Sequence, residues 1–68
     1  MALNPEHRQA AADMRDAADR AAAQAVNVTN ATTRNDALSA LYAVIVEAAS
    51  ARDGAQALYL LIDAEGEG

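Results

Sequence analysis

The stretch Asn35–Arg52, NDALSALYAVIVEAASAR, holds the densest set of large apolar side chains in the chain. Its apolar residues recur at the three- and four-residue steps that place side chains on one face of an α-helix: Leu38, Leu41, Tyr42, Ile45 and Ala49. Val44 and Val46 lie on opposite flanks of this face, so the apolar arc exceeds the roughly 100° stripe of an ordinary surface helix. We therefore expect a core helix here, with an apolar face too wide for one small neighbour to cover.

The chain is short, with 68 residues, and forms at most one domain. A domain of this size buries only about 60% of the surface that its unfolded chain exposes, so it is marginally stable alone. It has no cysteine for a disulfide, and its single histidine is too little for a structural zinc site. We expect no metal and no cofactor. Association with another chain, or close helix packing, must then supply the missing stability.

The composition excludes several classes of protein. A net charge of −5 opposes binding to the phosphate backbone of nucleic acids. No run approaches the roughly 18 apolar residues of a membrane span, and the start MALNPEH lacks the features of a signal peptide, so we expect a cytoplasmic protein with no membrane contact. All five cations are arginines and alanine is abundant, which is typical of a high-GC bacterium or one of its phages.

The first helix is predicted from about Pro5 to Val28. Asn4 is placed to cap it, Pro5 suits the first helical position, and Glu6 faces the positive helix end. A stripe of mostly small residues follows at helical spacing: His7, Ala10, Ala11, Met14, Ala17, Ala18, Ala21, Ala22, Ala25 and Val28. The opposite side is charged, and the pairs Arg15/Asp19 and Asp16/Arg20 are four residues apart. We expect the stripe to receive the large side chains of the central helix.

The segment 27–33, NVTNATT, consists mainly of poor helix formers and should end the first helix. Thr33 and Asp36 then resemble a capping box for a second helix from about Arg34 to Arg52. A turn this short predicts two antiparallel helices. Gly54 is a plausible stop for the second helix.

A short third helix is predicted over about 55–64, because a lone strand would have no partner in this chain. The fold class is therefore all-α, a helical hairpin plus this third helix, assembled as an oligomeric bundle. The domain spans 1–64, and residues 65–68 form a disordered acidic tail. We expect a homo-oligomer, most simply a dimer, since one alanine surface cannot cover the apolar residues assigned to its interface: Val44, Val46, Leu58, Tyr59, Leu60, Leu61 and Ile62.

Catalytic chemistry is not expected. The serines Ser39 and Ser50 have no base placed to activate them, and His7 is interpreted as a structural residue. The one polar concentration is the predicted turn, where hydroxyl, amide and guanidinium groups meet the start of a helix, which suits a small anion: Asn30, Thr33, Arg34 and Asn35. Turn and cap chemistry also accounts for every one of these residues.

Three classes of function remain. The first is a small self-associating helical protein that binds another protein, to adapt or inhibit it. The alternative is a helical hairpin of the phage type that binds or sequesters a small anionic ligand such as a signalling nucleotide. The third is an acidic decoy of a nucleic-acid-binding protein, suggested by the aspartates of the first helix.

Overall fold

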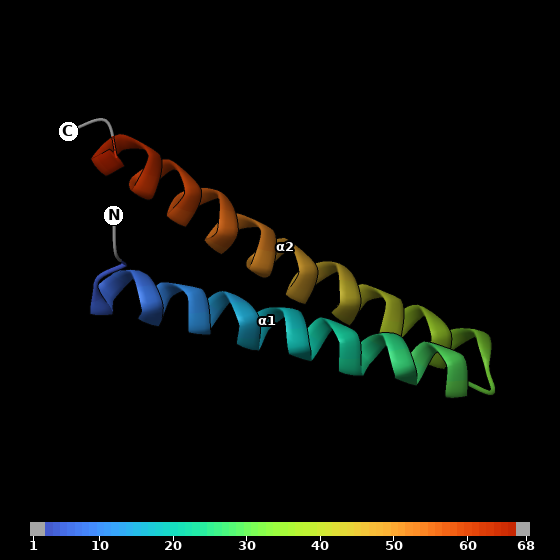
Figure 1. Cartoon of the computed structure of the whole chain (residues 1–68). Coiled ribbons are helices and arrows are strands. Elements are labelled where there is room, and N and C mark those ends of the chain that lie inside the picture. The colour runs from blue at the N-terminus through green and yellow to red at the C-terminus, as the bar shows by residue number, and fades with distance from the viewer. Residues whose placement is uncertain (1–2, 67–68) are drawn as a thin grey trace.

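The protein is a hairpin of two antiparallel α-helices, seen in a computed structural model that describes residues 3–66 (Figure 1). Helix α1 spans Pro5–Asn30 and helix α2 spans Arg34–Gly66, with only three residues between them. The hairpin measures 53 × 16 × 12 Å between Cα atoms. No residue in the range 3–66 lies in a strand. The all-α class and the antiparallel hairpin are confirmed.

Helix α1 begins with a capping box. Oδ1 of Asn4 accepts a hydrogen bond from the backbone N–H of His7 at 2.9 Å, and the N–H of Asn4 donates to Nδ1 of His7 at 3.4 Å. The two residues thus satisfy each other's backbone donors, with histidine in the place usually taken by Glu or Gln. Pro5 occupies the first turn, where its missing N–H costs nothing.

Helix α1 ends at Asn30, two residues later than the predicted end at about Val28. Oγ1 of Thr29 donates back to the carbonyl of Val26 at 2.7 Å, which keeps the last turn helical. The N–H of Ala31 donates to the carbonyl of Val28 at 3.3 Å and closes the helix. Oγ1 of Thr33 then accepts from the N–H of Asp36 at 3.1 Å, which confirms Thr33 as the cap but supplies only one of the two hydrogen bonds of the predicted capping box.

Helix α2 does not stop at Gly54, and no separate third helix exists in the part of the chain that the structure describes. The predicted second and third helices are one helix of 33 residues. Gly54 does not adopt the positive φ of a left-handed stop, since no glycine of the described chain does. Glu65 and Gly66, assigned to a tail, are the last residues of α2, and 67–68 lie outside the described residues. Neither helix has a stretch long and apolar enough to cross a membrane within 3–66.

The most deeply buried apolar residues between the helices have small side chains. Ala17 and Ala40 are buried, together with His7. Around them lie half-buried residues at alternating three- and four-residue steps, the spacing of a two-helix seam. In α1 these are Ala10, Met14, Ala21, Gln24 and Val28, and in α2 they are Ala37, Val44, Glu47, Ala51, Gly54, Leu58 and Ile62. Part of the predicted α1 stripe therefore faces α2, but Ala18, Ala22 and Ala25 of that stripe are exposed.

The face predicted to be the core of α2 lies on the outside. Leu38, Leu41, Tyr42 and Ile45 are 47%, 44%, 69% and 65% exposed, and Ala49 is exposed as well. That prediction is wrong. A hairpin of two helices buries only one stripe of each helix, and α2 turns its alanine and glycine positions inward, where the two backbones can approach closely. The widest apolar face is left without cover in the single chain.

Asn4→Ala is expected to lower the free energy of unfolding by about 1 kcal/mol, because it removes the acceptor for the His7 N–H. Urea denaturation at a fixed protein concentration measures the change. Asn35→Ala is the matched control, since Asn35 makes no side-chain hydrogen bond among the described residues. An equal loss in both variants would contradict the assigned cap.

Gly54→Ala is expected to raise the free energy of unfolding by about 0.5–1 kcal/mol, because alanine is the better helix former. A Cβ atom on Gly54 would lie 3.7 Å from Cβ of Met14, an ordinary contact distance, so the methyl group fits. Gly54→Leu would push the helices apart and should lower the same free energy. A destabilised Gly54→Ala variant would show that this approach is closer than the structure has it.

Candidate protein-binding surface

The outer side of α2 near the turn carries five large exposed apolar residues, which we call the turn-proximal patch: Leu38, Leu41, Tyr42, Ile45 and Val46. Their exposed fractions run from 44% to 69%. Single exposed apolar residues are normal, but five within three turns of one helix form a continuous surface. Such surfaces mark sites where a protein meets another protein.

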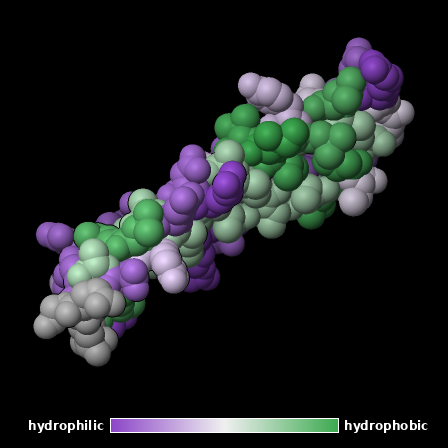
Figure 2. Space-filling model, turned by 90° about the horizontal axis from the view of Figure 1, so that it is seen from above, coloured by the Kyte–Doolittle hydropathy of each residue, from purple (hydrophilic) through white to green (hydrophobic). Residues whose placement is uncertain are grey.

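A second apolar group, the terminal patch, lies near the other end of α2 and consists of Tyr59, Leu60 and Leu61. Their exposed fractions are 71%, 57% and 48%. Between the patches run Arg52, Asp53 and Gln56, all exposed, which we call the polar band. Figure 2 looks down on the hairpin and shows the two hydrophobic regions with a hydrophilic band between them.

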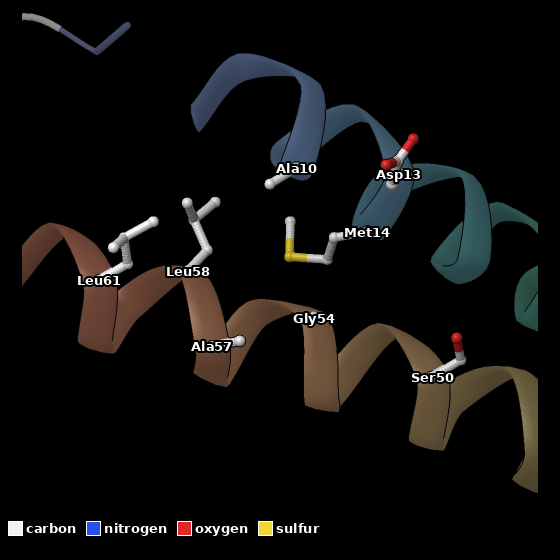
Figure 3. Close-up of a pocket in the computed structure, with 8 residues that line it drawn as sticks. All are labelled: Ala10, Asp13, Met14, Ser50, Gly54, Ala57, Leu58 and Leu61. Carbon is white, nitrogen blue, oxygen red and sulfur yellow. The ribbon is translucent and has the colours of Figure 1, made fainter. Parts of the chain in front are cut away.

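The interface residues predicted from the sequence are divided by the structure. Val46, Tyr59, Leu60 and Leu61 are exposed, whereas Val44, Leu58 and Ile62 are half-buried within the chain. Leu58 and Leu61 line a hollow of about 350 Å³ with Ala10, Met14 and Gly54. In Figure 3, the Met14 side chain lies in the space between the two helices, and Leu58 points toward α1 near Ala10. Leu58 therefore contributes to packing between the helices.

One long side of the hairpin is polar. Nε of Arg20 donates to Oε2 of Glu47 at 2.7 Å and links the two helices. The hydrogen bond from Arg20 to Glu47, with the attraction between their charges, raises the pKa of Arg20. The sequence predicted a pair of Arg20 with Asp16, but Arg20 reaches across to α2 instead. Arg15 and Asp19 approach to 3.9 Å as predicted. The aspartates of α1 are thus interleaved with arginines.

His7 ties the start of α1 to the end of α2. Its side chain is 3% exposed, and Nε2 lies 2.8 Å from Oε2 of Glu65. Nδ1 accepts from the N–H of Asn4, whereas the buried Nε2 has no partner in hydrogen-bond geometry despite its short distance to the Glu65 carboxylate. The ring therefore lies between the cap of α1 and the last turn of α2, hydrogen-bonded to the first and in close contact with the second. The interpretation of His7 as a structural residue accounts for all of these contacts.

Of the residues predicted to bind an anion, Asn30 ends α1 and Thr33, Arg34 and Asn35 are consecutive at the start of α2. A shallow hollow beside the turn includes Asn30 but also the carboxylate of Asp36, which repels anions. Thr33, Arg34 and Asn35 do not line it. Oγ1 of Thr33 already accepts the capping hydrogen bond.

Within residues 3–66 no group of three or more His, Asp or Glu side chains lies close enough together to hold a metal ion. Comparison of the chain with protein-family models, curated proteins and solved structures finds no match. The candidate surface therefore has to be judged on its own geometry and charge.

Sequence reasoning missed which stripe of α2 faces α1. The available signal was the alternating three- and four-residue spacing of small residues in both helices, beginning at His7 in α1 and Ala37 in α2. The large residues have the same spacing on another face of α2, and their greater area made that face the stronger candidate for the core.

Proposed function

We propose that this chain is a self-associating helical protein that acts through protein–protein contact, with a second copy covering the outer side of α2. The observation that carries the proposal is the exposure of the turn-proximal patch beside an interior of alanines. Burying the exposed leucine and isoleucine side chains against a partner would contribute more free energy than the buried alanines contribute within the single hairpin.

The size of the surface supports a copy of the same chain as the occupant. Covering the remaining exposed area of one such leucine or isoleucine contributes roughly 1–2 kcal/mol. Association itself costs about 4–15 kcal/mol. The apolar area of the patch alone offsets only the lower part of that cost, whereas a contact that runs along the whole 53 Å length of the hairpin adds further area toward the roughly 800 Å² per partner of a standard interface.

The assembled protein would then adapt or inhibit another protein. The charged outer face of α1 supports this step, because it stays accessible to another protein when α2 is covered. No structural observation favours the anion-binding alternative or the acidic decoy over contact with a protein.

Wild-type protein is expected to sediment as a dimer at micromolar concentration, with a melting temperature that rises with protein concentration. The double variant Leu41→Gln, Ile45→Gln removes apolar area while keeping good helix formers, and is expected to sediment as a monomer with a lower melting temperature. Ala23→Gln is the matched control, because Ala23 is exposed on the outer face of α1; its mass should equal that of the wild type.

Circular dichroism at high concentration separates loss of association from loss of folding in these variants. A wild-type monomer with a melting temperature indifferent to dilution would reject the proposal. A dimer that persists in the double variant would move the contact to another face of the hairpin.

A further inference from the structure

The exposed residues of α2 contain one continuous line that runs the length of the helix at three- and four-residue steps. It comprises Arg34, Leu38, Leu41, Ile45, Ala48, Arg52, Gln56, Tyr59 and Asp63, and every one of them is exposed. We call this set the α2 seam. Its spacing is that of a helix face that packs along a second helix.

We propose that two copies pair seam to seam in antiparallel orientation, with the two-fold axis between Ala48 and Ala49; this rests on the proposed self-association. In that register the seam is complementary to itself. Arg34 faces Asp63 of the other copy, Leu38 faces Tyr59, Leu41 faces Gln56, and Ile45 faces the aliphatic stem of Arg52. The alanines at the centre allow the two helices to approach closely.

The charges at the ends of the seam support this orientation independently. Arg34 is the first residue of α2, and Asp63 lies in its last turn. A cation at the amino end and an anion at the carboxyl end both oppose the helix dipole, so each charge is unfavourable in the isolated hairpin. Antiparallel pairing places each charge opposite its complement in the other copy, and does so twice across the axis.

A parallel pair would bring like charges together. Arg34 would face Arg34, Arg52 would face Arg52, and Asp63 would face Asp63, at three points along the same seam. The charge pattern therefore selects the antiparallel arrangement.

A second antiparallel register would overlap only the turn ends and would place Leu38 opposite Ile45. It would join the two turn-proximal patches but leave Tyr59 uncovered and Arg34 without its partner Asp63. It would also overlap only about half of α2, whose full length is about 50 Å at about 1.5 Å per residue. The full-length register covers the members of both patches that belong to the seam, Leu38, Leu41 and Ile45 near the turn and Tyr59 near the other end.

Helix α1 is shaped to lie beside this contact. On the flank away from Arg20, α1 exposes Ala18, Ala22 and Ala25 at four- and three-residue steps. Small side chains on this flank leave room for the α2 helix of the second copy. The complete assembly is a four-helix bundle, with the Arg20–Glu47 pairs on its outer sides.

Cross-linking between single cysteines tests orientation and register directly, because the natural chain has no cysteine. Leu38→Cys and Tyr59→Cys chains are made separately with tags of different length, unfolded and refolded together, and treated with a short bismaleimide. The expected product is the mixed dimer alone, with at least tenfold less product from either variant by itself. Ala23→Cys is the control for collisions between unassociated chains.

Three results would overturn the inference. Efficient cross-linking of Leu38→Cys with itself would show a parallel pair. Cross-linking of Leu38→Cys with Ile45→Cys in place of Tyr59→Cys would show the shorter register. Dimeric mass without any of these products would leave self-association standing and reject the seam, whereas a monomeric wild type would reject the proposed function itself.

Exchanging the charges of Arg34 and Asp63 gives a second test, which separates a contact across the dimer from an effect on the stability of the helix. Arg34→Asp and Asp63→Arg each improve the fit to the helix dipole, so helix content on dilution to monomer should hold or rise. Each should nevertheless weaken dimerisation roughly tenfold, and the double exchange should restore it. Asp16→Arg, the same charge change on the outer face of α1, should leave dimerisation unchanged. Single exchanges without effect on dimerisation would remove the Arg34–Asp63 pairing.

Discussion

The close approach of two helices along a stripe of alanine and glycine is the constraint on which the rest of this structure depends. Small side chains at Ala17, Ala40 and Gly54 allow the backbones to come together, and long runs of alanine hold the helical conformation with little loss of side-chain entropy. The same contact buries little apolar area per residue. Because small residues occupy the contact between the helices, many of the large apolar residues of α2 lie on its outer side without cover.

The two long sides of the hairpin differ in character because of this division. One side carries the Arg20–Glu47 bridge and the polar residues around it, while the outer side of α2 carries the apolar patches. The ends are fastened by local chemistry, the capping box with His7 and Glu65 at one end and the Thr33 cap at the other. A rigid rod with one apolar side is a natural unit for building a larger helical assembly.

Local features were the most predictable from the sequence. The caps at Asn4 and Thr33 and the short turn depend on neighbouring residues alone, so side-chain chemistry at fixed spacing was enough to place them. Gly54 was misjudged because a glycine ends a helix or allows a close approach according to what lies opposite, and Met14 is forty residues away. The orientation of α2 was misjudged for a related reason. By apolar area the Leu38 face is the stronger candidate for the core, but two helices without further partners pack most closely where the side chains of both are small.

The alanine interior also determines how the protein should respond to heat. The heat capacity of unfolding grows with the apolar surface that becomes exposed, and a hairpin that hides mainly methyl groups exposes little. A single hairpin should therefore unfold over a broad temperature range with a small heat-capacity increment per residue. Covering the outer side of α2 adds the larger side chains to the surface released on melting. In the proposed dimer, a sharp calorimetric transition would therefore reflect the assembled state rather than the single hairpin.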